Sequence, residues 1–243
     1  MKFDGNLSYL FNTGNNNGLI KNVISPVYDK SCTVLCRYTP DLEGMMNAMP
    51  DIGFLSTGIL CKNGQHIGIF FKQIKNYEGQ DPWLYRFSFE FWQKNFTEQT
   101  ILDIDIDYNT IEGRTFDISF TQTHDTFTFT VDGETVSTKY DKSKLIDYSN
   151  SYLWIGCANR LAPDWKHELI GEIHKMYIDL DITLPYSQKL FFDDYEAFNN
   201  KILNNKSSKA VFLSNFKKYT YYKIHDDSGN GNHPIKYDEE WIS

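Results

Sequence analysis

The stretch TFDISFTQTHDTFTFTVDGETV, residues 115–136, decides how this chain folds. Over residues 116–121 phenylalanine and isoleucine alternate with polar residues, and the alternation returns over residues 126–131. A period of two is typical of a β-strand with one buried and one solvated face. Asp132–Gly133 follows and suits a type I′ turn, because glycine takes positive φ without steric cost. We therefore predict a three-strand antiparallel meander whose apolar face a second sheet covers.

Similar alternating stretches recur on both sides of this meander, about 10–15 residues apart, with turn residues between them. They predict strands over residues 2–9, 32–38, 59–62, 65–73, 84–92, 101–108, 152–156 and 171–178. Short strands at this spacing are typical of an all-β protein. The predicted fold class is an antiparallel β-sandwich with one short C-terminal helix.

The pattern changes after residue 184. Residues 193–205 (DDYEAFNNKILNN) predict that helix, because three apolar side chains share one stripe: Tyr195, Phe198 and Ile202. A polar linker and a strand-like segment follow. We therefore predict a sandwich over residues 1–184 and an appendage over residues 185–243. The appendage is expected to pack on the sandwich or on a partner.

Three motifs in order resemble the laminin-G-like and concanavalin A-like jelly rolls. They are the threonine- and aromatic-rich strand with its Val-Asp-Gly turn, residues 152–156 (YLWIG), and residues 171–178 (GEIHKMYI). Together they span about residues 115–184. The resemblance implies a jelly roll of the lectin–glucanase superfamily. It implies little about chemistry, because this fold hosts lectins, adhesion modules, virion proteins and hydrolases.

A second resemblance lies in residues 226–233 (DDSGNGNH). This string is similar to the turn that opens laminin-G-like jelly rolls in bacterial and phage surface proteins, where it lies near the N-terminus. Either the C-terminal segment fills the usual N-terminal strand position, or the turn begins a second module that this chain lacks. Asp226, Asp227 and Asn230 supply oxygens that suit calcium, although Asx and Gly residues form such turns without metal.

Composition limits the classes of partner. A net charge of −8 argues against nucleic acid and against an anionic membrane surface. No apolar run reaches the roughly 20 residues of a membrane-spanning helix, and we expect no signal peptide. We therefore expect a cytoplasmic protein or a virion component made in the host cytoplasm. The four cysteines, Cys32, Cys36, Cys61 and Cys157, are expected to be reduced and mostly buried.

Three aspartates, Asp103, Asp105 and Asp107, project from one face of a predicted strand. This spacing resembles the Glu-x-Asp-x-Glu strand of laminarinase-like glucanases, whose two glutamates act as nucleophile and acid/base. The resemblance implies catalytic roles for these positions. However, each glutamate is replaced by an aspartate, which is one methylene shorter. A solvated strand face and a calcium site are the alternatives.

Two predicted loops display aromatic rings beside polar groups, which is how sugar sites are built. Residues 158–167 carry Arg160, Asp164, Trp165 and His167, and residues 75–83 carry Tyr77 and Trp83. The alternative is that the tryptophans pack over the rim of the sandwich.

Taken together, these features predict a non-catalytic lectin-like module that contacts glycans or a partner protein. The resemblances favour a phage or other virion component, such as a tail, receptor-binding or capsid-decorating protein, oligomeric or part of a larger assembly. The alternatives are a laminarinase-like glycoside hydrolase and a cytoplasmic protein whose jelly roll only mediates assembly. No cofactor is expected other than, in the alternative above, calcium.

Overall fold

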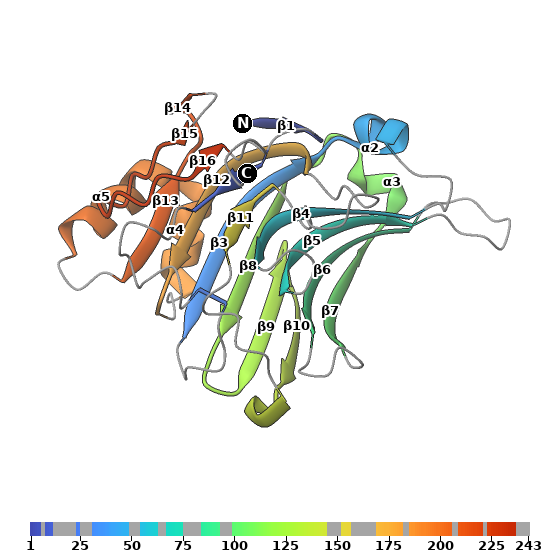
Figure 1. The fold of residues 1–243 in the computed structure, drawn as a ribbon, viewed down its shortest axis with the longest axis horizontal. Helices are drawn as coiled ribbons and strands as arrows, with labels where there is room; N and C mark the ends of the chain where they lie inside the picture. The colour runs from blue at the N-terminus through green and yellow to red at the C-terminus, as the bar shows by residue number, and fades with distance from the viewer. Residues whose placement is uncertain are drawn as a thin grey trace, which may run out of the picture.

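A computed structural model describes residues 1–5, 8–11, 23–24, 31–48, 54–62, 67–74, 84–92, 99–144, 152–156, 169–181, 185–205, 209–220 and 223–236. Within these residues the chain forms two antiparallel sheets that enclose one large apolar core (Figure 1). The predicted fold class, an antiparallel β-sandwich, is confirmed.

The first sheet has seven strands in the described part of the chain. In spatial order they are β1 (Lys2–Asp4), β12 (Ile170–Asp179), β3 (Cys32–Pro40), β8 (Phe116–Gln122), β9 (Thr126–Val131) and β10 (Glu134–Lys139), with β13 (Ala210–Ser214) also pairing with β12. We call this the seven-stranded sheet.

The second sheet, the nine-stranded sheet, has nine strands in the same described residues. In spatial order they are β14 (Tyr219–Thr220), β15 (Lys223–Ile224), β16 (Ile235–Lys236), β2 (Tyr9–Leu10), β11 (Leu153–Ile155), β4 (Phe54–Lys62), β5 (Ile67–Ile74), β6 (Leu84–Trp92) and β7 (Gln99–Ile106). The C-terminal strand β16 pairs with the N-terminal strand β2.

The predicted meander is strands β8, β9 and β10 of the seven-stranded sheet. Both residues of its second turn have positive φ, 48° at Asp132 and 91° at Gly133, as a type I′ turn requires. Its apolar face meets the nine-stranded sheet through phenylalanine pairs. Ring centroids lie 4.1 Å apart for Phe89 and Phe120, and 5.0 Å apart for Phe87 and Phe116.

Helices occur at the ends of strands and after residue 184: α2 (Leu42–Ala48), α3 (Tyr108–Ile111), the 3-10 turn η3 (Lys142–Lys144), α4 (Pro185–Asp193) and α5 (Tyr195–Asn204). The predicted helix is α5, and Asp194 caps it by accepting a hydrogen bond from the Ala197 amide. Helix α4 precedes it and was not predicted. It begins at Pro185, whose missing N–H is no loss in a first helical turn.

In its described residues the C-terminal segment joins the sandwich in three places. β13 pairs with β12, β16 pairs with β2, and helices α4 and α5 cover part of the outer face of the seven-stranded sheet (Figure 1). There Phe191 and Phe198 form a second apolar cluster with Leu35 and Tyr177.

Three of the four cysteines lie in described residues, and Cys32, Cys36 and Cys61 are buried free thiols, as predicted. Burial raises the pKa of the Cys32 thiol to about 12. Cys157 lies outside the described residues. No helix in the described ranges has both the length and the apolar character that crossing a membrane requires.

Candidate functional site

The sequence-predicted sugar-binding loops lie outside the described residues. This holds for all six side chains that the loop prediction names: Trp165, Asp164, Arg160, His167, Trp83 and Tyr77. Their role in ligand binding therefore stays a prediction.

The aspartates of β7 belong to a hydrogen-bonded network on the outer face of the nine-stranded sheet. Arg86 on β6 donates from Nη1 to Asp103 Oδ2 at 2.7 Å and from Nε to Asp105 Oδ1 at 2.9 Å. Ser88 Oγ donates to Asp103 Oδ1 at 2.5 Å. Asp107 follows the strand and caps α3, accepting a hydrogen bond from the Asn109 amide at 2.9 Å.

A second ion pair extends this network across β5 and β6. Lys72 donates to Glu90, and both residues are buried. Burial lowers the pKa of Lys72. Outward-facing charges on β5, β6 and β7 are therefore paired with charges on the neighbouring strand. Each of these ion pairs holds its side chains in one geometry. In the acid/base pair of a glycosidase, by contrast, one carboxyl holds a proton at neutral pH.

The DDSGNGNH turn forms its own hydrogen bonds with β13. Asp226 Oδ1 accepts from the amides of Leu213 at 3.1 Å and Ser228 at 2.9 Å, and its Oδ2 accepts from the Asn232 amide at 2.8 Å. The Asn230 side-chain amide donates to the Ala210 carbonyl at 2.6 Å. Within the described ranges no group of three or more His, Cys, Asp or Glu side chains is arranged to hold a metal. The calcium site stays a prediction.

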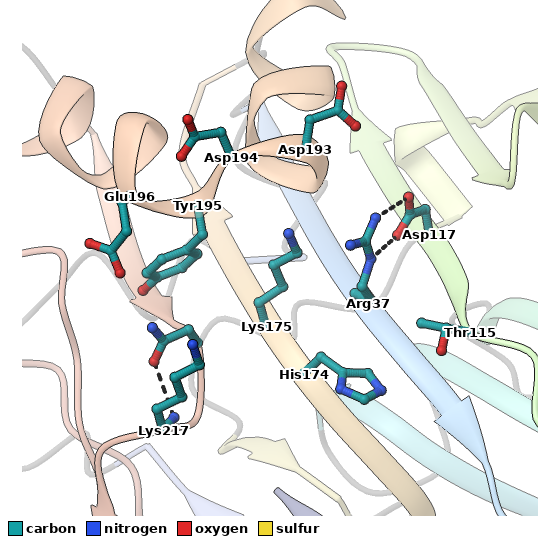
Figure 2. A pocket seen from close by; sticks show the side chains of 11 residues that line it. Arg37, Thr115, Asp117, His174, Lys175, Asp193, Asp194, Tyr195, Glu196 and Lys217 are labelled. Atoms are coloured by element: carbon teal, nitrogen blue, oxygen red, sulfur yellow. Dashed lines mark hydrogen bonds and ion pairs between the residues drawn. The ribbon is translucent and has the colours of Figure 1, made fainter.

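A groove of about 610 Å³ lies on the outer face of the seven-stranded sheet. Its floor comes from β3, β8 and β12, and its walls come from the α4–α5 junction and the loop after β13 (Figure 2). We call it the helix groove. It is lined by Arg37, Thr115, Asp117, His174, Lys175, Asp193, Asp194, Tyr195, Glu196, Asn215 and Lys217.

A β-bulge in β12 shapes the floor of the helix groove. The register with β3 shifts between Ile173, which is buried in the core, and Lys175, which lies opposite Arg37. His174 is the extra residue, and its Nε2 lies 2.8 Å from Thr39 Oγ1. Bulges re-aim side chains and are frequent beside functional sites. Burial lowers the pKa of His174, which favours the neutral ring.

Two basic side chains on the floor of the helix groove hydrogen-bond to neighbouring elements. Lys175 Nζ donates to the carbonyls of Phe191 and Phe192, each at 2.8 Å, and so binds the C-terminal end of α4. Burial, with a smaller effect from nearby Arg37, lowers the pKa of Lys175 to about 8. Arg37 makes two parallel hydrogen bonds to the carboxylate of Asp117, at 2.6 and 2.7 Å.

The wall of the helix groove combines an aromatic ring with polar groups. Tyr195 is half-buried, and its hydroxyl donates to Asp227 Oδ2 at 2.8 Å. Burial raises the pKa of this hydroxyl, so it stays protonated. Glu196 and Lys217 are exposed on either side of the ring (Figure 2). The groove thus offers hydrogen-bond donors and acceptors, and it holds side chains of both charges.

Sequence reasoning did not find the helix groove. Its residues come from five segments, around positions 37, 115, 174, 195 and 217, and no local pattern links them. On their own strands Arg37 and Asp117 read as ordinary solvated positions. Only the docking of α4 and α5 makes them a floor.

Comparisons with known proteins support the fold. No family model matches the sequence, and no curated protein matches it. One similar structure is that of a Bacteroides ovatus protein proposed to bind carbohydrate. The match covers 98% of this chain and 57% of that protein, with a TM-score of 0.55 and 11% identity. This chain therefore spans little more than half of that protein.

Two further structures are similar to parts of the chain. The enzymatically active domain of tailspike protein 2 from bacteriophage CBA120 matches 71% of this chain and 25% of its own, with a TM-score of 0.46 and 10% identity. The CBM40 of the Ruminococcus gnavus IT-sialidase matches 74% of this chain and 89% of its own, with the same TM-score and identity. The chain has a lectin-like jelly-roll fold.

Proposed function

We propose that this protein is a non-catalytic glycan-binding module and that the helix groove is its binding site. The observation that carries the proposal is the groove itself, an open pocket of about 610 Å³ lined by polar side chains on a lectin-like sandwich. Ligand pockets commonly have volumes of about 300–1,000 Å³. The Bacteroides structure that resembles the chain over nearly its whole length is itself proposed to bind carbohydrate.

The lining favours a ligand rich in hydroxyl groups. It holds three cationic and four acidic side chains, so neither sign of charge dominates. Each sugar hydroxyl both donates and accepts hydrogen bonds, and carboxylates, amides and ammonium groups supply the complementary partners. The Tyr195 ring adds a flat surface for the apolar face of a sugar.

The β7 aspartates argue against hydrolysis. Arg86 binds both Asp103 and Asp105, and Asp107 caps a helix. A glycosidase needs one carboxyl that carries a proton and a second that is free to attack or to activate water. A carboxylate pair bound to one arginine is poorly suited to either role.

The setting we propose is a virion, where the module contacts glycans or other virion proteins and is made in the host cytoplasm. The resemblance of DDSGNGNH to turns in phage surface proteins supports this setting. Detection of the chain by mass spectrometry in purified virus particles tests it.

A glycan array, followed by titration calorimetry on the best ligand, tests the function. The groove variant is Glu196→Gln/Lys217→Gln, and the matched control is Glu134→Gln/Lys139→Gln on β10, which removes the same charges elsewhere. We expect the groove variant to bind about tenfold more weakly, because it loses two charge-assisted hydrogen bonds to hydroxyls. The control should bind like the wild type.

Two results would contradict the proposal in different ways. If folded wild-type protein binds no glycan, the function is wrong. If Trp165→Ala abolishes binding and the groove variant retains it, the function holds and the site is the loop at residues 158–167.

A further inference from the structure

The C-terminal hairpin carries a second pocket, of about 500 Å³, that differs in charge from the helix groove. It is lined by Lys218, Tyr219, Thr220, Lys223, His225 and His233. We propose that this hairpin pocket binds the anionic group of an acidic sugar, a carboxylate or a sulfate. The inference rests on the proposed function and names the class of glycan that the module selects.

The strand register gathers the cations on one face. Thr220 lies opposite Lys223, and the His225 amide donates to the Lys218 carbonyl at 3.0 Å. Side chains two residues apart on a strand share a face, so Lys223 and His225 lie together, and Ile224 between them is buried. The ring of His233 lies beside that of His225, with centroids 5.0 Å apart.

The charge of this segment is opposite to that of the whole chain. Residues 209–236 contain five lysines and two aspartates, whereas the chain has a net charge of −8. Both aspartates have hydrogen-bond partners inside the protein. Asp226 accepts hydrogen bonds from three backbone amides, and Asp227 accepts one from the Tyr195 hydroxyl. Lys218 Nζ is 3.8 Å from the nearer Asp227 oxygen, while 70% of its side chain remains exposed. The outward-facing charge at the hairpin pocket is therefore positive.

Most of the exposed lining of the hairpin pocket is apolar, and its residues suit an acidic sugar in two respects. Lysine ammonium groups act as point charges for a carboxylate or sulfate. His233 Nδ1 accepts a hydrogen bond from the Asp226 amide at 2.9 Å. The proton of the neutral ring is therefore on Nε2, which can donate a hydrogen bond. The two imidazoles offer flat faces for a sugar ring. A neutral sugar would offer no anionic group to either lysine.

The test uses three oligosaccharides of equal length: a uronate oligomer, its carboxyl-reduced neutral form, and a sulfated form of the neutral oligomer. Binding of each to wild-type protein is measured by titration calorimetry at low salt. The variant is Lys218→Gln/Lys223→Gln. The matched control, Lys139→Gln/Lys209→Gln, removes two exposed lysines outside both pockets.

We expect wild-type protein to bind at least one charged oligomer about tenfold more tightly than the neutral one. The variant should lose this preference and keep its affinity for the neutral oligomer, and the control should keep both. A preference for the uronate oligomer identifies the bound group as a carboxylate, and a preference for the sulfated oligomer identifies it as a sulfate. Equal affinity for all three oligomers, or a preference that survives in the variant, would overturn this inference and leave the proposed function standing. Absence of binding to every oligomer and every array glycan overturns both.

Discussion

At the scale of single residues, Asp179 is a buried carboxylate that is only partly satisfied. It lies at the end of β12, where its Oδ2 accepts a hydrogen bond from the Tyr177 hydroxyl and its Oδ1 has no hydrogen-bond partner. Only 8% of the surface of Asp179 is exposed. Burial raises the pKa of Asp179 above the ordinary value of 3.8. The ionised carboxylate is therefore less favourable in the folded protein than in the unfolded chain.

Asp179→Asn should stabilise the protein at pH 7 by about 1–2 kcal/mol, because the neutral amide removes the cost of burying an ionised carboxylate. Because the folded pKa is raised, the contribution of Asp179 to stability falls as pH rises from 3.8 towards that higher pKa and then stays low. Below pH 3.8 both states hold the proton, so the variant should lose its advantage. Urea unfolding at pH 3.5 and pH 7 measures both effects.

Asp181→Asn is the control, because Asp181 is two residues away, is largely exposed and pairs with an exposed lysine. Its free energy of unfolding should stay within about 0.5 kcal/mol of the wild type. A less stable Asp179→Asn variant at pH 7 would show that the carboxylate has a partner that the amide cannot replace.

At the scale of elements, the turn at residues 226–233 holds β13 in the sheet. One carboxylate, Asp226, accepts hydrogen bonds from the backbone amides of Leu213, Ser228 and Asn232. Amides of Asn230 and Asn232 donate to β13 carbonyls. The composition of the motif is therefore explained by turn chemistry, in which short polar side chains hydrogen-bond nearby backbone.

Asp226→Ala should destabilise the protein by about 2–3 kcal/mol, because three buried amides lose a charged acceptor. Asp125→Ala, in the exposed turn between β8 and β9, should change little. Thermal unfolding of each protein with calcium and with a chelator is the measurement. We expect the same wild-type midpoint in both conditions. A midpoint that calcium raises in the wild type and not in Asp226→Ala would establish the calcium site instead.

At the scale of the whole molecule, residues 185–236 contribute to both sheets and to the outer surface. β13 extends the seven-stranded sheet, β14 to β16 extend the nine-stranded sheet, and helices α4 and α5 cover Leu35 and Tyr177. The helix groove exists only where these helices meet the sheet.

A chain ending at residue 184 should fail to give a soluble, cooperatively folding product. β12 would lose its pairing with β13, β2 would lose β16, and the Leu35–Tyr177 patch would face solvent. Soluble yield and the sharpness of urea unfolding, compared with the full chain, measure this. A soluble fragment with a single sharp transition would make residues 1–184 an independent domain.

Local pattern alone determined much of the sandwich. Alternation over residues 84–92 predicted β6 with its observed ends, and the alternation around Asp132–Gly133 predicted β8, β9 and β10. These predictions hold because a half-buried strand must place every second side chain in the core. By contrast, β13 reads AVFLS and is buried on both faces, so it has no alternation to detect.

The partners of polar residues were decided only by the tertiary structure. The spacing of Asp103 and Asp105 predicted a shared strand face, but the register of β6 with β7 determined that Arg86 binds both. The helix groove likewise needs a β-bulge at His174 and the docking of α4 and α5. Periodicity tells which side chains face outward. Which distant segment meets them depends on strand pairing and helix packing, whose contacts join residues far apart in the chain and leave no local signal.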